Sequence, residues 1–304
     1  MRRRSSLLGG IALTFATVLA ACSTGTQTSA TRNGKLAVVA AESSWGSIAR
    51  QLGGDKVDVK EIVNSPDADP HDYEPTPADA RDLATARYVI LNGLGYDAWA
   101  SDLVNANESE ERTVLDIGDL LGLNAGDNPH RWYFPDDVTR VIDRITADFQ
   151  SIDPANASYY ARQHDQYVGT TMRPYRDLLA KIRAIGAGTP VGASESAVEG
   201  VAQATGLDLT TPASFLDAIS EGNDPDASDK VTVDDQIENR RIAVFIANSQ
   251  NATPDVQRLV RAAHGHNIPV VSVTETPVPA GVNFQDWQTA QLQQLANALT
   301  EATG

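Results

Sequence analysis

Short apolar runs alternate with helical patterns through most of this 304-residue chain, and that alternation restricts the fold more than any other feature. The runs with the length and composition of buried strands are Lys35–Ala40, Val57–Val63, Tyr88–Leu91, Val114–Ile117, Pro190–Ala193, Ile242–Ile246 and Pro269–Val273. Helical patterns occur at Ser44–Leu52, Pro77–Thr85, Asp97–Asn105, Pro135–Ile152, Ala197–Thr205, Pro254–Ala263 and Asp286–Leu299. Strands that alternate with helices favour parallel sheets covered by helices, which is an α/β fold.

One segment interrupts this alternation. Residues 154–186 are mostly polar and helical in pattern, and Pro174 within them predicts a kink or a division into two helices. We therefore expect two α/β lobes, at residues 34–153 and 187–304, each with a small parallel-type sheet flanked by helices. One long, rigid helix over 154–186 would bridge the lobes. The acidic segment Glu221–Asp235 is interpreted as a solvated surface loop, because it lacks the glycine of an EF-hand loop.

The first residues have the pattern of an export signal. A basic stretch, Arg2–Arg4, precedes an apolar run at Leu7–Ala21 that is short for a membrane span. The run ends in Leu-Ala-Ala-Cys, which resembles a bacterial lipobox. We expect residues 1–22 to be a lipoprotein signal peptide with Cys22 as the lipidated residue, and residues 23–33 to be a flexible tether. The alternative is a plain secretory signal, and export by the Sec or the Tat route stays open.

Charge and cysteine content exclude several classes of function. The formal net charge is −16 at pH 7, so the protein would repel nucleic acid and anionic membrane surfaces. A single cysteine excludes a disulfide framework and a thiolate-rich zinc or iron–sulfur site. We therefore expect an extracytoplasmic protein that contacts the cell membrane only through a lipid anchor.

Two histidines lie in similar proline-containing loops. His71 is part of Asp-Pro-His-Asp-Tyr-Glu-Pro at 69–75, and His130 is part of Asn-Pro-His-Arg-Trp at 128–132. The prolines stiffen both loops, and a rigid histidine near carboxylates suits a metal ligand. Either loop alone also fits an ordinary polar turn. The repeated pattern favours a metal site that the two loops share.

Two glutamates follow directly after predicted strands. Glu195 comes just after Pro190–Ala193, and Glu275 comes just after Pro269–Val273. Ligands of open α/β sheets bind beyond the carboxyl ends of strands. Either glutamate alone also fits an exposed acid at a helix N-terminus. Each half of the chain thus offers two candidate ligands, and a cleft between the lobes would bring all four together.

The order and spacing of several motifs resemble one known family, the solute-binding proteins of bacterial ABC importers for zinc or manganese. The resemblance covers nearly all of residues 34–301. It rests on DPHDYEPTP (69–77), NGLGYDAW (92–99), NPHRW (128–132), ASE (193–195), NSQNATPDVQRLV (248–260) and PVVSVTETPVPAG (269–281). It implies two α/β lobes joined by a rigid long helix, with one divalent metal ion between them.

The resemblance also assigns roles to individual residues. His71 and His130 match the two histidine ligands of the family. Glu195 stands where zinc members usually have a third histidine and manganese members have glutamate, and Glu275 stands where the family usually has aspartate. Asn128 replaces a common aspartate before the Pro-His pair. The implied cargo is one ion of Mn²⁺ or Zn²⁺.

A binding protein rather than an enzyme is therefore expected. It would act as a monomer that captures the metal outside the membrane and delivers it to a cognate ABC permease. Oxygen-rich ligation favours manganese in relative terms, whereas imidazole suits zinc and the Irving–Williams order gives zinc the higher affinity. The sequence leaves the choice between the two metals open.

Two alternatives to metal capture stay open, and the first of them, a metallohydrolase, would use the same four residues. A lipid-anchored metallohydrolase would need an open coordination position and a general base beside the bound water. Neither a His-Glu-x-x-His motif nor a Gly-x-Ser-x-Gly elbow occurs in the chain. The third alternative is a binder of a larger chelate, or an adhesin that retains the fold.

Overall fold

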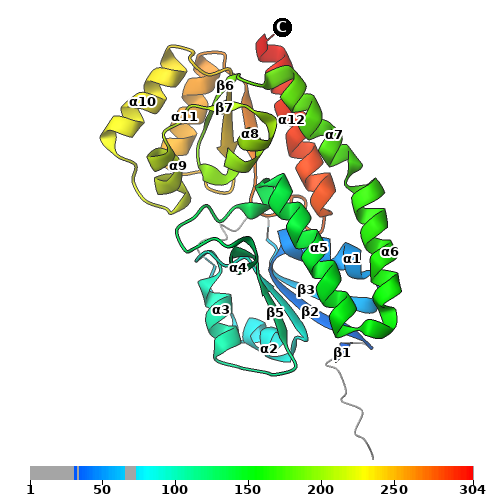
Figure 1. Ribbon diagram of the computed structural model, residues 1–304. Coiled ribbons are helices and arrows are strands. Elements are labelled where there is room, and N and C mark those ends of the chain that lie inside the picture. The colour runs from blue at the N-terminus through cyan, green and yellow to red at the C-terminus, as the bar shows by residue number, and fades with distance from the viewer. Residues whose placement is uncertain (1–30, 33, 66–72, 304) are drawn as a thin grey trace, which may run out of the picture.

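The computed structural model describes residues 31–32, 34–65 and 73–303, which form two sheets, each covered by helices (Figure 1). The first sheet contains β1 (Thr31–Arg32), β2 (Lys35–Glu42), β3 (Val57–Val63), β4 (Tyr88–Leu91) and β5 (Thr113–Asp116). In it, β2 pairs in parallel with β3 and β4, β4 pairs in parallel with β5, and β1 pairs antiparallel with the start of β2. The helices of this lobe are α1 (Ser43–Gly53), α2 (Pro77–Thr85), α3 (Ala98–Asn105), α4 (Ile117–Leu121) and α5 (Pro135–Ile152), with the short turns η1 (Gly54–Lys56) and η3 (Arg131–Tyr133).

The second sheet is entirely parallel. Its strands are β6 (Pro190–Ala193), β7 (Asp208–Leu209), β8 (Val244–Asn248) and β9 (Val270–Val273), in the spatial order β7-β6-β8-β9. The covering elements are η6 (Ser196–Val198), α8 (Glu199–Thr205), α9 (Ala213–Ser220), α10 (Ala227–Glu238), α11 (Pro254–Gly265) and α12 (Phe284–Thr303). The α/β class, the two lobes and the parallel sheets agree with the sequence prediction. Predicted element ends differ from the observed ones by a few residues.

The sequence explains how these elements form. β2 is buried from Leu36 onwards, which its continuous apolar run requires. On α5, Val138, Val141, Ile142 and Ile145 recur at helical spacing, and all of them are buried in the largest apolar cluster. This cluster includes residues of both lobes, so a shared core holds the lobes beside each other.

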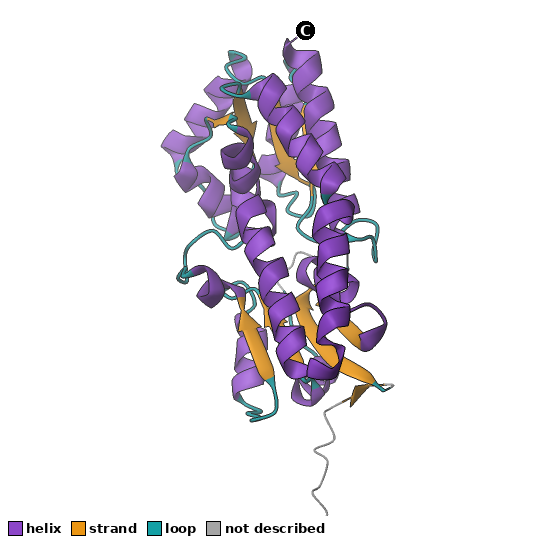
Figure 2. Cartoon of the chain, turned by 45° about the vertical axis from the view of Figure 1, so that its right-hand side comes forward, coloured by secondary structure: helices purple, strands orange, loops and turns teal. Residues whose placement is uncertain are grey.

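A helical connection links the lobes, as predicted. It consists of η4 (Pro154–Asn156), α6 (Ala157–Gln166), a π-helical turn η5 (Tyr167–Thr171) and α7 (Arg173–Gly186), and it runs along one side of both lobes (Figure 1 and Figure 2). Pro174 lies in the first turn of α7 and has no N–H to continue the bonding pattern of α6. The helix is therefore divided at this point, and α7 then packs against α12.

Two predictions are corrected by the structure. The segment Glu221–Asp235 is not a loop throughout, because α10 occupies Ala227–Glu238. Val233 and Ile237, one helical turn apart, are buried in the second apolar cluster, and this packing stabilises a helix whose other residues are mostly polar. The tether predicted over 23–33 also ends earlier, since Thr31–Arg32 forms β1 against β2.

The predicted signal peptide, Cys22 and most of the tether lie outside the described residues. Within the part of the chain that the structure describes, helices are either too short or too polar to cross a membrane.

Candidate metal centre

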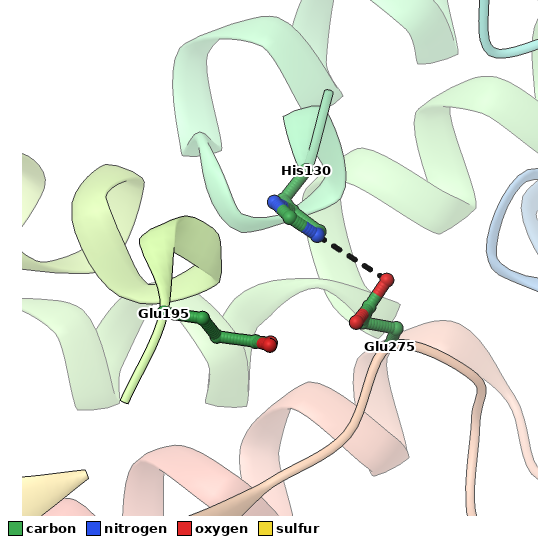
Figure 3. Close-up of side chains that lie close together, drawn as sticks. All are labelled: His130, Glu195 and Glu275. Carbon is green, nitrogen blue, oxygen red and sulfur yellow. Dashed lines mark ion pairs between the residues drawn. The ribbon is translucent and has the colours of Figure 1, made fainter. Parts of the chain in front are cut away.

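Three of the four predicted ligands lie together in the structure. His130, Glu195 and Glu275 each offer one ligand atom, and these atoms lie within 4.8 Å of one another. Figure 3 shows the three side chains directed toward a common point. The exposed fractions of His130, Glu195 and Glu275 are 0%, 1% and 3%, so the cluster is buried. The fourth predicted ligand, His71, lies outside the described residues.

Parallel strand ends explain how the two glutamates meet. Glu195 follows β6, Glu275 follows β9, and β8 lies between these two strands. The last residue of β8 is Asn248, so its side chain lies between the two glutamates at the carboxyl edge of the sheet. His130 comes from the other lobe, in the loop that precedes η3. The cluster therefore joins residues of both lobes.

Hydrogen bonds hold the ring of His130. Its Nδ1 lies 2.9 Å from Oδ1 of Asn128 and 3.4 Å from Oγ of Ser196. Its Nε2 lies 3.2 Å from Oε2 of Glu275. When Nδ1 faces the oxygen of Asn128, Nε2 is the ring atom that faces the carboxylate of Glu275. This arrangement suits a histidine that binds metal through Nε2.

Neutral donors surround both carboxylates. The side-chain amide of Asn248 donates to Oε1 of Glu195 at 2.5 Å and to Oε1 of Glu275 at 2.7 Å. Asn251 donates to Oε2 of Glu195 at 3.2 Å, and the Tyr96 hydroxyl donates to Oε2 of Glu275 at 2.7 Å. These bonds fix the carboxylates without cancelling their charge. Two buried carboxylates beside an imidazole are a set of donor atoms that suits a divalent cation.

Aromatic side chains form one wall of the cluster. Trp132 packs edge-on against His130, with ring centroids 5.5 Å apart, and Tyr96 contacts both rings. Trp45 packs against Trp132 and donates from Nε1 to Oδ1 of Asn92. Both tryptophans are fully buried. They therefore pack beneath the His130 loop, which is the role that aromatic bulk usually has.

Tyr133 stays neutral beside the cluster. Burial raises the pKa of the Tyr133 hydroxyl well above its usual value, and the charges of Glu275 and Glu195 raise it further. The hydroxyl donates to the carbonyl oxygen of Thr274 at 2.7 Å and lies 3.0 Å from Oε1 of Gln291. Tyr133 therefore positions the start of the Glu275 loop through its neutral hydroxyl.

A second buried carboxyl pair lies at the edge of the first sheet. Glu42 ends β2, and Asp97 accepts hydrogen bonds from the backbone N–H groups of Asn92 and Gly93 at 2.7 and 2.8 Å. Burial raises the pKa of Asp97 to about 6. Burial, followed by the proximity of Asp97, raises the pKa of Glu42 well above its usual range. Asn92 also donates to the carbonyl oxygen of Pro129, so this pair connects to the His130 loop.

Sequence reasoning missed the residues that orient the candidate ligands. Tyr96, Asn248 and Asn251 donate to the carboxylates, and Glu42 and Asp97 form the buried acid pair. The signal for Asn248 was available, because an amide at the end of a strand between two ligand-bearing strands must lie near both. The strand pattern predicts a strand that ends at Ile246, whereas β8 ends two residues later, so Asn248 was not recognised as a strand-end residue.

The family described as "Zinc-uptake complex component A periplasmic" (ZnuA) matches residues 38–298. The chain therefore belongs to this family, as its motifs indicated. The family is one of substrate-binding components of ABC importers, so the expectation that the chain is not an enzyme is also confirmed.

Named relatives agree with this assignment. The iron ABC transporter substrate-binding lipoprotein MtsA of Streptococcus pyogenes serotype M1 is 28% identical over 198 residues, which cover 61% of this chain and 63% of the relative. The manganese ABC transporter substrate-binding lipoprotein PsaA of Streptococcus pneumoniae serotype 4 is 31% identical over 175 residues, which cover 53% and 56%. The chain thus spans less than two thirds of the length of these relatives.

The fold also matches solved structures. The solute-binding protein FpvC from Pseudomonas aeruginosa, in complex with Ni²⁺, superposes with a TM-score of 0.73 at 21% identity, covering 89% of this chain and 98% of that one. This similarity shows that the two chains share a fold.

Proposed function

We propose that this member of the zinc-uptake component family captures a divalent transition-metal ion, Mn²⁺ or Zn²⁺, outside the cytoplasmic membrane and delivers it to a cognate ABC permease. The observation that carries the proposal is the buried cluster of His130, Glu195 and Glu275, built from both lobes. A cation there would bind donor atoms from both lobes, two carboxylates and an imidazole. The names of relatives that transport iron and manganese support a metal cargo.

His71 is proposed as the fourth ligand. The segment that contains it connects the carboxyl end of β3 to α2, and β3 runs parallel to β2 in the same sheet. Loops at this edge of an α/β sheet are where ligands bind. Two imidazoles and two ionised carboxylates would leave a bound M²⁺ formally neutral, which a buried site requires.

The ligand set bears on which metal is bound. Two glutamates that chelate through both oxygens would raise the coordination number above four, which suits Mn²⁺ better than tetrahedral Zn²⁺. The Irving–Williams order acts in the opposite direction, since most such sites bind Zn²⁺ more tightly. The proposal is therefore a site that accepts both ions, with selectivity set by the denticity of Glu195 and Glu275.

The N-terminal motif completes the proposal. Residues 1–22 would direct export, Cys22 would carry the lipid, and residues 23–30 would tether the folded part to the membrane. The lobes at 34–153 and 187–304, with the connection at 154–186, would act as one monomeric unit. The named lipoprotein relatives support an extracytoplasmic, membrane-anchored location.

A metal titration tests this function. Protein lacking residues 1–22 is stripped with a chelator and titrated with Mn²⁺ and Zn²⁺, separately and in competition, while its thermal stability is followed. We expect one ion per chain and a large rise in melting temperature, because a ligand that binds only the folded state stabilises it. Absence of binding to either ion would overturn metal capture and favour a chelate binder or an adhesin.

A further inference from the structure

One side chain, Asn128, touches both lobes at the site. Its Oδ1 accepts the backbone N–H of His130 at 2.9 Å and lies 2.9 Å from the ring Nδ1 of the same residue. Its Nδ2 donates to the carbonyl oxygen of Ser196 at 2.8 Å and to Oε2 of Glu199 at 2.9 Å. Ser196 begins η6 and Glu199 begins α8, both in the second lobe. Asn128 therefore connects a candidate ligand on one lobe to two consecutive elements of the other.

The backbone determines which way this amide faces. A backbone N–H only donates and a backbone carbonyl only accepts, so Oδ1 faces His130 and Nδ2 faces Ser196. An aspartate at position 128 would keep both bonds to His130. It could not donate to Ser196, and its charge would face the carboxylate of Glu199. The two bonds from position 128 to the second lobe, to Ser196 and to Glu199, thus require an asparagine.

The lobes are packed tightly near these bonds. A Cβ on Gly200 would lie 2.4 Å from the carbonyl oxygen of Tyr133, so α8 approaches η3 more closely than a side chain allows. Near Asn128, a groove of about 300 Å³ is lined from both lobes, with Tyr96 on one side and Ser196 on the other. The bonds of Asn128 therefore hold the lobes together beside an open groove.

We propose that Asn128 is a latch between the lobes, and that its pairing with Glu199 and Ser196 must break before the lobes separate. Where it concerns metal release, this inference rests on the proposed function. The same amide orients the ring of His130, so separation of the lobes and loss of a well-oriented ligand are coupled through one side chain. Asn128 is a positioning residue in this scheme, since it would not itself bind the ion.

The first test measures the lobes without metal. Spin labels are placed at Asn105→Cys on α3 and Val231→Cys on α10, two exposed positions in different lobes, in a purified Cys22→Ser chain. The interlobe distance distribution is then compared for wild-type position 128, Asn128→Asp, Glu199→Gln and the double variant. We expect Asn128→Asp to lengthen and broaden the distribution. An unchanged distribution would overturn the latch, whether or not the protein binds metal.

Glu199→Gln supplies a matched control, because its expected effect on the interlobe distance differs between the wild-type and the Asn128→Asp backgrounds. On the wild-type background, the glutamine oxygen still accepts from Asn128, so the distances should stay the same. On the Asn128→Asp background, the glutamine N–H donates to the new carboxylate, so the distribution should narrow again. Equal effects of Glu199→Gln on both backgrounds would overturn the direct pairing. Urea unfolding of all variants checks that each one is folded.

Metal release gives the second test. Rapid mixing with excess chelator should release Zn²⁺ from Asn128→Asp about tenfold faster than from wild type, and the double variant should recover at least about threefold of this change. Release at the wild-type rate from Asn128→Asp would overturn the coupling to metal release. A wild-type chain that binds neither Zn²⁺ nor Mn²⁺ would overturn the proposed function instead, and the distance measurement would still decide the latch.

Discussion

Asn248→Leu removes a hydrogen-bond donor that both candidate carboxylates share. The amide of Asn248 donates to Glu195 at 2.5 Å and to Glu275 at 2.7 Å, and its oxygen accepts the backbone N–H of Gln250 at 2.9 Å. Leucine is close to asparagine in size, so the change removes these bonds without opening a large cavity. A hydrogen bond to a charged group contributes about 1.5–3 kcal/mol. We expect the metal-free protein to lose roughly 3 kcal/mol or more of its free energy of unfolding.

Urea unfolding with a chelator present, and then with saturating Zn²⁺, measures this change. The bound cation itself balances Glu195 and Glu275, so metal should stabilise the variant more than it stabilises wild type. Asn239→Leu is the control, since it removes a 2.8 Å bond to Asp235 that is exposed, and it should cost less than about 0.5 kcal/mol. A loss below about 1 kcal/mol for metal-free Asn248→Leu would refute the idea that the shared amide stabilises the carboxylate pair.

Further changes test other parts of the site. His71→Ala and His130→Ala should each lower metal affinity roughly 100-fold in a competition titration and leave the circular dichroism spectrum unchanged; wild-type affinity in both would contradict the ligand set. Glu195→His should shift the zinc-to-manganese affinity ratio toward zinc, because an imidazole replaces a hard oxygen ligand, and a constant ratio would exclude that role. In the folded protein, Glu42 and Asp97 hold protons at pH values where the unfolded chain releases them, so the stability that these two groups contribute should be lost as pH rises from about 4 to about 6. Glu42→Gln should flatten this slope by up to about 1.4 kcal/mol per pH unit in urea titrations; a slope equal to that of wild type would count against the buried pair.

The sequence predicted the sheet edges well and the contacts across them poorly. Strand patterns ending at Ala193 and Val273 were sufficient to place Glu195 and Glu275 at one edge, because parallel strands end on the same side. Periodicity carries no information about which side chain reaches which carboxylate. The shared amide of Asn248 and the Tyr96 hydroxyl, which lies far away in sequence, depend on strand order and on how the lobes pack.

The helix α10 also shows where prediction from the sequence fails, because its own composition does not indicate a helix. It contributes few apolar residues to the core, since Val233 and Ile237 join the second apolar cluster but most residues around them in the sequence are acidic or polar. Local composition therefore favoured a loop. The helix forms because α11 packs against it in the folded lobe, where residues of both helices share one apolar cluster.

The charge near the candidate metal site depends on the direction of the Arg131 side chain. Arg131 is adjacent to His130 in sequence and could have neutralised a carboxylate of the cluster. Its guanidinium instead donates from Nε to Oδ2 of Asp137 at 2.9 Å and lies 3.5 Å from the centre of the Phe134 ring. Asp137 therefore compensates the charge of Arg131 away from Glu195 and Glu275. Asp137→Asn should therefore weaken metal binding modestly, by about two- to fivefold, since an uncompensated cation would then lie near the site. Zn²⁺ is titrated into this variant and into Asp143→Asn, which changes an exposed carboxylate on the same helix. The comparison separates the loss of the Arg131 partner from the loss of any one negative charge on α5. Equal affinity in both variants would show that Arg131 is already screened from the carboxylates and that the field of the site is set by its ligands alone.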